Sequence, residues 1–481
     1  MNKPFVKMFE ICTGYYFYDI GKNCIMAVNR GVYRYIQELC KYGYEVFEDK
    51  YKDNQDVDYL TIKRLRQKNY LSNNKPVEIY HPYTDFAEEY VNSNLNNLIL
   101  QVTQMCNFNC AYCPYAGNGK FDRGHYNKAM PWDIAQRAVD LLIKNSRNSK
   151  ELSIGFYGGE PLLEYQLIQK VVRYSKEKAG IKNLQFGMTT NGYMITDEMV
   201  DFFKKYGFSI TISFDGPQHI HDKNRTLGAN GKGTFQQVYK NMKKMKEKGL
   251  SFGINAVWDT EEAFDQVTNF FDSDPLFSGI NMTLNQVMTG RIDTGYSVSA
   301  ESKYSEDVFV VKAYLNYLGL YKQLTQKEKD YAIEAYENTA RLLKEQEKMP
   351  RQFHHGGPCM PGQLKLFVDI YGDFFPCERI SGKSKVMRIG SVDSGFDMVQ
   401  IKKILNIGKI TEQECKECWA MHLCSICSMW ADNDENAFCK KIKLNRCNYT
   451  RALASKDIKD YIIITEIKNM LKEKNVINYK V

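Results

Sequence analysis

Short apolar stretches alternate with amphipathic stretches along the chain from about residue 95 to residue 290. Short apolar runs between turn residues predict buried strands, and apolar residues spaced three and four apart predict helices. Six strands are expected at NLILQVT, LSIGFYG, LQFGMTTNG, SITISFDG, SFGINAVW and GINMTLNQV, with helices such as PWDIAQRAVDLLIKNS and DEMVDFFKKYG between them. This repeat favours an α/β fold with a partial (β/α)6 TIM-like barrel, in which functional residues follow the carboxyl ends of strands.

The pattern before the barrel predicts a small α+β module over residues 1–90. GYYFYDIGKNCIMAVN predicts two strands around the turn Gly21–Asn23, and RGVYRYIQELCKYG predicts a helix that stops near Gly43. A second helix through YLTIKRLRQKNYL and a strand at PVEIYHP complete a winged-helix-like pattern. The alternative interpretation is a plain accessory domain.

Helical and cysteine-dense segments follow the barrel. Thr325–Glu328 is a capping box that opens a helix running to about Lys348, and a final helix is expected at 451–476. The predicted domains are the N-terminal module at 1–90, the barrel at 95–304, a helical bridge at 305–350, a cysteine-rich domain at 351–450 and a C-terminal helix at 451–481.

Composition narrows the class of protein. The chain has 481 residues, of which 43% are hydrophobic and 25% charged, as in globular proteins of several domains. The first twenty residues contain Glu10 and Asp19 and lack an apolar core, so we expect no signal peptide, no membrane span and a cytoplasmic location. The net charge of +8 comes from lysines interleaved with acids, which indicates solvated helix faces and no nucleic-acid partner, and it suits an acidic peptide.

Cysteine is the most informative residue type. The chain has 14, and eight of them lie between Cys359 and Cys447. In a reducing compartment such clusters indicate metal ligands rather than disulfides. Cys12, Cys24 and Cys40 match no ligand spacing, and we expect them to be buried structural thiols.

Three cysteines lie within eight residues in the segment QVTQMCNFNCAYCPY, directly after a predicted strand. Cys106, Cys110 and Cys113 would supply three thiolates to one centre. A four-iron cluster held by three cysteines keeps one iron without a protein ligand. The alternative is zinc, whose three-ligand sites usually include histidine, and the nearest histidine along the chain is His125.

The segment CNFNCAYC resembles the CxxxCxΦC signature of the radical S-adenosylmethionine (SAM) enzymes, with Tyr112 at the aromatic position. That resemblance implies a [4Fe-4S] cluster whose open iron binds SAM. It also implies a 5′-deoxyadenosyl radical released by one-electron cleavage of the sulfonium, chemistry that belongs to the cofactor.

Further motifs match the same family along the barrel. YGGEPLL resembles the GGEP motif that meets the SAM amino group, and its two glycines would let the backbone approach the ligand closely. TTNG and SFDGP resemble the later SAM contacts, and Arg225 is expected to hold the SAM carboxylate, with a surface salt bridge as the alternative. The SAM-binding residues implied by the resemblance are Tyr112, Gly158, Gly159, Glu160, Thr189, Asn191, Ser213, Asp215 and Arg225.

The C-terminal cysteines resemble the SPASM extension of radical SAM maturases, which binds two auxiliary [4Fe-4S] clusters and so implies three clusters in all. The outer cluster is expected on Cys415, Cys418, Cys424 and Cys447, and the inner cluster on Cys359, Cys377 and Cys427. The chain departs from the family pattern in having two residues between Cys424 and Cys427, one additional cysteine, and Phe353 in place of an upstream cysteine. The inner cluster therefore has an open iron, or it uses Cys439, His354 or His355, two histidines otherwise expected to be solvated.

Glu378 directly follows Cys377 in FPCERI. A carboxylate at this place serves as general base in the sulfatase maturases that the chain resembles, and a dry pocket would raise its pKa toward neutrality. The alternative is an ion pair with Arg379 or a nearby lysine.

Three functions compete. The first is a maturase of a ribosomally made, cysteine-rich peptide. The leader of that peptide would bind the N-terminal module, and its cysteines would form thioether links, as in the sactipeptide and ranthipeptide enzymes that the chain resembles. Epimerisation and carbon–carbon cross-linking are variants of this function. The second is an anaerobic sulfatase-maturating enzyme that forms formylglycine. The third is a non-catalytic protein with structural metals. Both enzymatic readings require an electron donor such as flavodoxin or ferredoxin.

Overall fold

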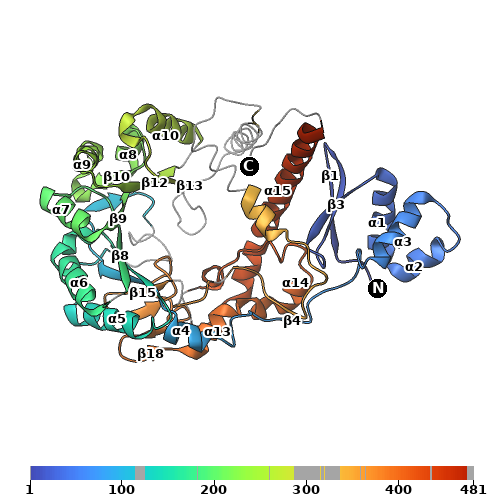
Figure 1. The fold of residues 1–481 in the computed structure, drawn as a ribbon, viewed down its shortest axis with the longest axis horizontal. Helices are drawn as coiled ribbons and strands as arrows, with labels where there is room; N and C mark the ends of the chain where they lie inside the picture. The colour runs from blue at the N-terminus through green and yellow to red at the C-terminus, as the bar shows by residue number, and fades with distance from the viewer. Residues whose placement is uncertain are drawn as a thin grey trace.

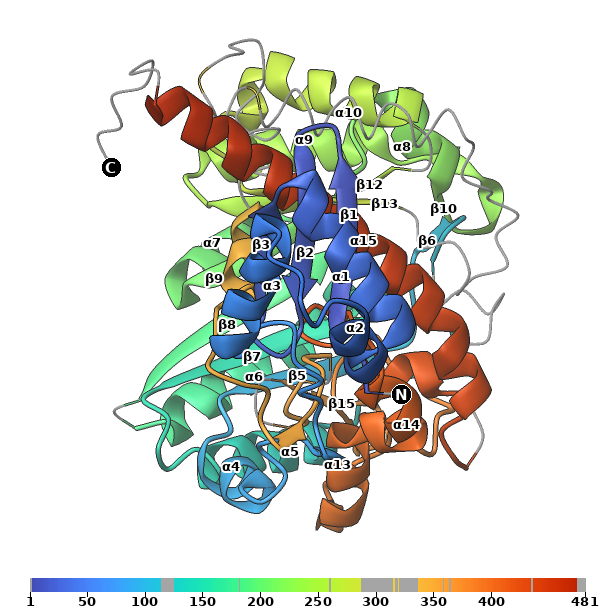
Figure 2. The same cartoon turned by 90° about the vertical axis from the view of Figure 1, so that its right-hand side faces the viewer.

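The computed structural model describes residues 2–113, 125–180, 182–258, 261–286, 315, 319, 336–357, 359–362, 365–433 and 436–473. An arc of strands and helices forms one side of the molecule, and the N-terminal module forms the other (Figure 1). The long helix α15 (Lys440–Glu473) lies between them, and the view turned by 90° shows it running behind the N-terminal module (Figure 2). The cysteine-rich region therefore joins the two halves.

Six parallel strands form the barrel sheet, and all six were predicted from the apolar pattern. They are β5 (Asn97–Thr103), β7 (Glu151–Gly158), β8 (Asn183–Thr190), β9 (Phe208–Ser213), β12 (Phe252–Trp258) and β13 (Met282–Gln286). They pair in chain order, each parallel to the next. The carboxyl ends of these strands therefore meet along one edge, as parallel pairing requires.

Amphipathic helices connect the strands. They are α5 (Trp132–Lys144), α6 (Tyr165–Lys178), α7 (Asp197–Tyr206), α8 (Gln218–Asn224), α9 (Phe235–Glu247) and α10 (Glu261–Ser273). In α7 the side chain of Thr196 accepts a hydrogen bond from Met199 N, and Gly207 ends the helix in the left-handed conformation. Phe156, Phe186 and Phe208 stack in the core that the helices and sheet share.

The cysteine-rich region extends the barrel sheet. Strand β15 (Leu366–Val368) pairs parallel to β5, and β16 (Asp373–Phe375), β17 (Gly390–Ser391) and β18 (Gly395–Phe396) continue the sheet antiparallel. The sheet is thus mixed and has ten strands in the described part of the chain. The sequence predicted only the six parallel ones, because β15 to β18 are each two or three residues long, too short for an apolar period.

The N-terminal module is a three-stranded antiparallel sheet with helices on one face. The strands are β1 (Val6–Ile11), β2 (Gly14–Asp19) and β3 (Cys24–Val28), and the helices are α1 (Arg30–Tyr42), α2 (Tyr44–Lys50) and α3 (Val57–Gln67). The predicted hairpin and both predicted helices are present, and β1 and α2 are additions. The expected strand near residue 79 exists as β4 (Glu78–Ile79), but it pairs with β14 (Gln352–Phe353) and leaves the module sheet.

Both faces of the module sheet are covered. Phe17 packs with Ile36 and Ile62 of the module helices. On the opposite face Phe9 and Tyr18 pack with Ile458 of α15. The sheet is therefore sandwiched between its own helices and the cysteine-rich region.

The C-terminal segments begin and end at residues other than expected. They are α13 (Met398–Leu405), the 3-10 segment η4 (Ile407–Thr411), α14 (Glu412–Lys416), η5 (Ser428–Ala431) and α15. Because α15 already begins at Lys440, Cys447 is helical and the predicted boundary at residue 450 falls inside a helix.

The expected capping box at Thr325–Glu328 lies outside the described residues. The helical stretch that starts the next described segment stops at Leu342, short of the predicted end near Lys348. Asn23 Nδ2 donates hydrogen bonds to the carbonyl oxygens of Leu342 and Lys344, which fixes this helix end to the turn between β2 and β3.

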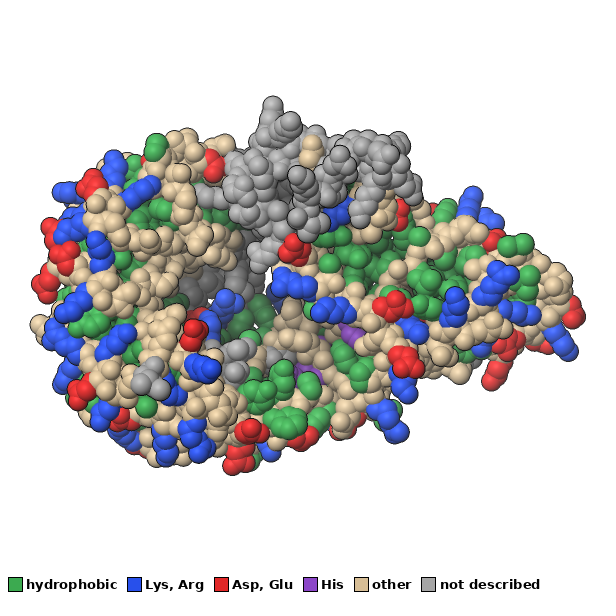
Figure 3. Space-filling view, in the orientation of Figure 1, with side chains coloured by type: hydrophobic (Ala, Val, Ile, Leu, Met, Phe, Trp, Pro, Cys, Tyr) green, Lys and Arg blue, Asp and Glu red, His purple; other side chains and the backbone are tan. Residues whose placement is uncertain are grey.

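No helix in the described ranges has the length and apolar character needed to cross a membrane. Lys and Arg side chains are interspersed with Asp and Glu over the face shown in Figure 3, in line with the solvated helix faces predicted from the sequence. The same view shows a hollow between the barrel side and the side that carries α15 (Figure 3).

Candidate metal and cofactor sites

The three-cysteine loop is held to the barrel by a small antiparallel sheet. Strand β6 (Phe108–Cys110) pairs with β10 (Arg225–Leu227), so that Cys110 lies opposite Arg225. The backbone continues this contact, since Ala111 N donates to Asn224 O at 2.9 Å. The loop that would hold the metal is therefore positioned by the segment after β9, more than a hundred residues later in the chain.

Asp215 lies at the centre of a buried polar network that reaches this loop. Arg225 donates to its carboxylate from Nε at 2.8 Å and from a terminal nitrogen at 3.0 Å, and Val257 N donates at 2.9 Å. The hydroxyl of Tyr112 also donates to the same carboxylate. Asp215 thus ties the aromatic residue of the cysteine motif, β10 and β12 together.

This network changes the expectation for two predicted residues. Arg225 is 6% exposed and Asp215 is 0% exposed, so the surface salt bridge considered for Arg225 is wrong. The ion pair is buried and bidentate, which is the strong geometry for this pair of groups. The Asp215 carboxylate accepts its hydrogen bonds from protein groups in this arrangement. Contact of Asp215 or Arg225 with SAM stays a prediction.

His221 binds the backbone of Asp215. Asp215 N donates to His221 Nδ1, so the neutral ring carries its proton on Nε2, which lies 3.0 Å from Thr234 Oγ1. Burial and the nearby Arg225 charge lower the pKa of His221 to about 4. Neither His221 nor Thr234 was singled out in the sequence, because a buried histidine at a helix end has no spacing signal.

The two glycines of the GGE motif have a packing role that was not predicted, and the expected approach of a ligand stays a prediction. A Cβ on Gly158 would lie 2.1 Å from Thr103 O, and a Cβ on Gly159 would lie 2.0 Å from Met105 O. Gly158 also has a φ of 144°, which favours glycine. Glycine is needed here because the start of the cysteine loop packs onto this backbone, whether or not a ligand also approaches it.

Glu160 is 1% exposed at the carboxyl end of β7. Its carboxylate accepts from Leu162 N at 3.0 Å, from Thr190 Oγ1 at 2.6 Å and from Asn191 N at 2.7 Å. Burial raises the pKa of Glu160, while these three donors act against that shift. Since a carboxylate has about four acceptor positions, the three protein donors leave one position for a further hydrogen bond.

The strands after β7 contribute side chains at the same edge. Asn191 Nδ2 donates to Asn107 Oδ1 at 2.7 Å, which links TTNG to the cysteine loop. Thr189 and Ser213 are half-buried at the ends of β8 and β9. Thr190, which the sequence analysis passed over, contacts Glu160, and the alternation of buried positions along β8 was the available signal for it.

The three thiols of the motif lie near one another. The pKa of the Cys106 thiol is raised to about 12, mainly by burial and to a smaller extent by the nearby Glu160, Cys110 and Cys113. His125 Nε2 lies 3.8 Å from Cys113 Sγ, so the histidine discussed with the zinc alternative does approach the motif. Tetrahedral zinc with three cysteines and one histidine is therefore a competing occupant on side-chain chemistry alone.

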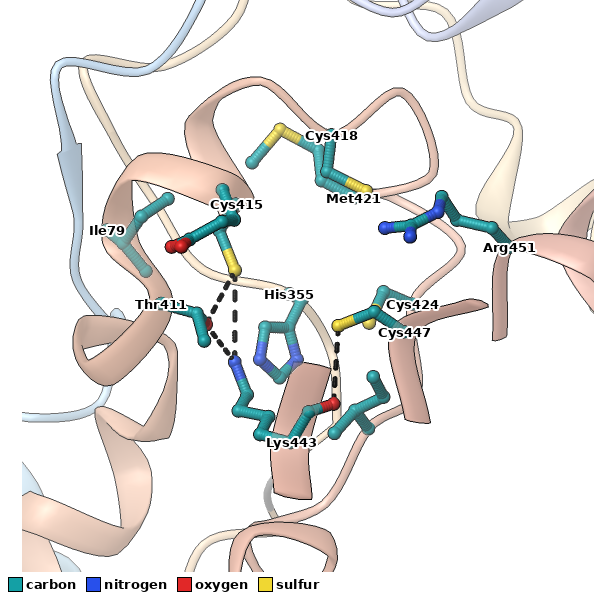
Figure 4. Close-up of a pocket in the computed structure, with 12 residues that line it drawn as sticks. Ile79, His355, Thr411, Cys415, Cys418, Met421, Cys424, Lys443, Cys447 and Arg451 are labelled. Atoms are coloured by element: carbon teal, nitrogen blue, oxygen red, sulfur yellow. Dashed lines mark hydrogen bonds between the residues drawn. The ribbon is translucent and has the colours of Figure 1, made fainter. Parts of the chain in front are cut away.

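Four predicted cysteines line one cavity of the C-terminal region. Cys415, Cys418, Cys424 and Cys447 surround it, as expected for the outer cluster (Figure 4). Lys443 Nζ lies 3.8 Å from Cys415 Sγ and 2.5 Å from Thr411 Oγ1. Burial raises the pKa of the Cys424 thiol to about 12.

The two adjacent histidines are buried, not solvated. His354 is 6% exposed; Gly408 N donates to its Nε2 at 2.8 Å, and its Nδ1 lies 2.7 Å from His355 O. His355 is 3% exposed and lines the four-cysteine cavity (Figure 4). Both ring nitrogens of His354 are thus occupied, and His355 lies at the outer cavity, so neither matches the inner-cluster ligand that was considered.

The residues expected at the inner cluster are only partly brought together. Burial raises the pKa of the Cys377 thiol to about 11, and the nearby Glu378 and Cys427 contribute to that shift. Cys359 is exposed. Cys439 is half-buried, and its backbone N donates to Ala431 O at 2.7 Å. The choice between an open iron and Cys439 stays a prediction.

Glu378 forms the ion pair that was its alternative interpretation. Lys365 Nζ lies 3.0 Å from Glu378 Oε1, because the hairpin of β15 and β16 brings the residues before and after it together. The Glu378 side chain is 13% exposed and that of Lys365 is 43% exposed. Its role as a general base is untested by this contact.

The three cysteines of the N-terminal module differ in burial. Cys12 is exposed, against expectation, and Cys24 and Cys40 are half-buried. Burial raises the pKa of the Cys40 thiol to about 11. Thiols of this kind are unreactive as metal ligands until deprotonated.

Within the described ranges, no three His, Cys, Asp or Glu side chains are close enough in their present positions to hold a metal ion. The donor sets nevertheless fit iron–sulfur clusters, since three thiols meet at one loop and four thiols line one cavity.

Comparison with known proteins identifies the barrel. Residues 100–271 match the family described as the Radical SAM superfamily. Radical SAM cyclopropyl synthase TigE of Paramaledivibacter caminithermalis is 26% identical over 235 residues, covering 46% of this chain and 48% of that protein. A cysteine-type anaerobic sulfatase-maturating enzyme of Clostridium novyi is 28% identical over 186 residues, covering 37% of this chain and 48% of that enzyme.

The chain spans about half the length of these curated relatives. Among solved structures, native anSMEcpe with bound AdoMet superimposes with a TM-score of 0.56 at 20% identity, covering 78% of this chain and 99% of that one. The likeness extends beyond residues 100–271 and shows a shared fold.

Proposed function

We propose that this protein, an enzyme of the radical SAM superfamily, modifies a peptide chain that its N-terminal module captures. Cys106, Cys110 and Cys113 would hold the [4Fe-4S] cluster at the end of β5. When bound there, the cluster and SAM supply the 5′-deoxyadenosyl radical. Glu160 would accept a hydrogen bond from the SAM amino group at the edge where β7 and β8 end.

The proposal of a peptide substrate is supported mainly by the sheet of the N-terminal module, which is covered on both faces. Its two faces are covered by the module helices and by α15, so an added chain can join only at an edge. In the described part of the chain β1 and β3 are the edge strands. An extended leader peptide binds such an edge by backbone hydrogen bonds, with pockets reading alternate side chains.

The module also contacts the cysteine-rich region directly, which supports a link between capture and chemistry. Phe9 of β1 packs edge-on against Trp419. Trp419 lies between the cavity residues Cys418 and Cys424 along the chain. His422 Nε2 donates to Ile20 O at 3.1 Å. A peptide held at this sheet would therefore lie close to the proposed auxiliary clusters.

The proposed product is a thioether between a peptide cysteine and a carbon atom. For each link the substrate carbon would lose one hydrogen atom, which would leave as part of deoxyadenosine. The thiol would lose its proton to water, and sulfur would join carbon with release of one electron. An open iron near Cys377 and Cys427 would keep the substrate sulfur as thiolate, the form that iron binds. The released electron would return through the cysteine-rich region to the oxidised form of the electron donor, such as flavodoxin or ferredoxin.

Two other outcomes have specific support. Sulfatase maturation is favoured by the sulfatase-maturating relatives and by the fold shared with anSMEcpe, which has also been solved with the Cp18Cys peptide bound. Carbon–carbon bond formation is favoured by the likeness to a cyclopropyl synthase. Both use the same barrel chemistry and differ in the substrate that is presented.

Mass spectrometry of co-expressed peptides separates these outcomes. A cysteine-rich peptide with its leader should lose one pair of hydrogens for each link, and alkylation should find the linked cysteines blocked. A sulfatase-derived peptide should be unchanged. Conversion of that peptide to formylglycine, with the cysteine-rich peptide untouched, would replace the thioether proposal with sulfatase maturation.

A further inference from the structure

The four-cysteine cavity is lined by positively charged and hydrogen-bond-donating groups as well as by thiols. Lys443, Cys447 and Arg451 are spaced four residues apart on α15, and all three side chains line the cavity (Figure 4). Residues four apart lie on one face of a helix. The helix that contributes one cysteine therefore places a cation one turn before it and another one turn after it.

Lys443 is a buried cation whose contacts are a hydroxyl and a thiol. It is 1% exposed, and its Nζ contacts Thr411 Oγ1 and Cys415 Sγ. Within the described ranges no carboxylate lies at ion-pair distance from it. The carboxylate of Glu414 also lines the cavity and is affected by the Lys443 charge, but it is 41% exposed and pairs with Lys440 at 2.7 Å. A buried charge without a close countercharge is costly, so a further negative partner is expected at this place.

His355 directs an unsatisfied hydrogen-bonding atom into the same cavity. Gly357 N donates to His355 Nδ1 at 3.3 Å, which leaves the proton of the neutral ring on Nε2. Nε2 is buried and has no hydrogen-bond partner among the described atoms. A buried unsatisfied donor costs about 1–3 kcal/mol, and an acceptor in the cavity would remove that cost.

The backbone around His355 is fixed by close packing. A Cβ on Gly357 would lie 1.8 Å from Ile426 O, in the segment between Cys424 and Cys427. On the other side, His354 is held by the hydrogen bond from Gly408 N. The ring of His355 is thus positioned by both neighbours rather than by contact with solvent.

We propose that Lys443 and His355 are positioning residues that stabilise the reduced state of the cluster held by Cys415, Cys418, Cys424 and Cys447. Four thiolates on a [4Fe-4S] core give a centre with net negative charge, and reduction adds one more. The ammonium of Lys443 offsets that charge, and His355 Nε2–H donates to a cluster sulfur. Charge and hydrogen bonds to sulfur are the features that set the reduction potential of such clusters. This inference rests on the proposed occupancy of the cavity.

Potentiometric titration followed by electron paramagnetic resonance tests the inference on the full-length, reconstituted protein. The signal of the outer cluster is the one lost in Cys447→Ala. In Lys443→Met that signal should titrate at lower potential, with the reduction equilibrium weakened about tenfold or more, which corresponds to ~59 mV for one electron. His355→Phe should shift it in the same direction.

Two matched variants control for structural damage. Lys441→Met removes the same charge from an exposed position of the same helix and should leave the potential unchanged. Lys443→Arg keeps the charge and should keep the iron and a potential near that of the unmodified protein. Loss of the outer iron in Lys443→Met but not in Lys443→Arg also supports the inference.

The inference is overturned by an unshifted potential in Lys443→Met with full iron content, or by loss of the outer iron in both Lys443 variants. The proposed binding of a cluster in the four-cysteine cavity is tested separately by Cys447→Ala. If Cys447→Ala loses neither iron nor a signal, the cavity holds no cluster.

Discussion

Arg225 and Asp215 form a buried, two-point ion pair directly behind the three-cysteine loop. Arg225 also lies opposite Cys110 in the β6–β10 ladder, so the pair fixes the strand from which the cysteine motif projects. The family likeness suggested that both residues face SAM. The contacts show that they hold the three-cysteine loop in place, and this makes their removal a test of loop position.

Replacing Asp215 should destabilise the protein strongly. Asp215→Ala leaves the Arg225 charge buried without its partner, which costs about 3–5 kcal/mol of unfolding free energy. Denaturant unfolding checks this value, with Asp201→Ala as the control, because its pair with Lys248 is exposed and worth about 0–1 kcal/mol. Equal losses in the two variants would contradict the importance given to the buried pair.

A methyl group on the GGE motif should displace the cysteine loop. In Gly159→Ala the added carbon would lie 2.0 Å from Met105 O, and we expect deoxyadenosine formation to fall at least about tenfold because the loop must move to avoid the clash. Gly187→Ala is the control, since its nearest neighbour in the same sheet is 3.7 Å away. Normal SAM cleavage by Gly159→Ala would show that the loop position does not matter.

The metal content should distinguish iron–sulfur clusters from zinc. Anaerobically reconstituted protein should bind about twelve irons if all three sites hold four-iron clusters, and Cys106→Ala/Cys110→Ala/Cys113→Ala should bind about eight and form no deoxyadenosine. His125→Ala should keep its iron, because the fourth iron of the proposed cluster would bind SAM and needs no histidine ligand. Stoichiometric zinc that is lost in His125→Ala would favour the three-cysteine, one-histidine site.

Acid should weaken the barrel through His221. The pKa of His221 is about 4 in the folded protein, below its usual value near 6.5, so the unfolded chain takes up the proton first as pH falls. Its contribution to stability is complete above about pH 6.5 and is lost as pH falls toward 4, by about 2 kcal/mol between pH 7 and pH 5. Urea unfolding at both pH values should show a smaller difference in His221→Gln, whereas His219→Gln, at an exposed position, should keep it.

Binding of a leader peptide should protect the edge of the module sheet. Hydrogen exchange with and without the peptide should slow for amides of β3 or β1, while β2, already paired on both sides, should change little. This measurement is preferable to deletion of residues 1–90, which would expose the apolar surface of α15 and the cysteine-rich region. Protection found only within the barrel would contradict capture by the module.

The sequence alone predicted the six barrel strands and the cysteine motifs. Both signals are local: a short, mainly apolar stretch such as Asn97–Thr103 identifies a buried strand, and the spacing of Cys106, Cys110 and Cys113 lies within one loop. Helical spacing on α15 also relates Lys443, Cys447 and Arg451. The likeness of the barrel to radical SAM enzymes followed from such motifs and was confirmed by the family match.

The tertiary structure decided which distant groups meet and which face the protein. The pairing of β4 with β14, the ion pair of Glu378 with Lys365, and the burial of His355 at the four-cysteine cavity all join segments whose order along the chain carries no distance information. A side chain's partner depends on how sheets and helices pack, and packing is a property of the whole fold. The sequence therefore determined the chemistry that this protein carries, and the fold determined which of its residues hold that chemistry in place.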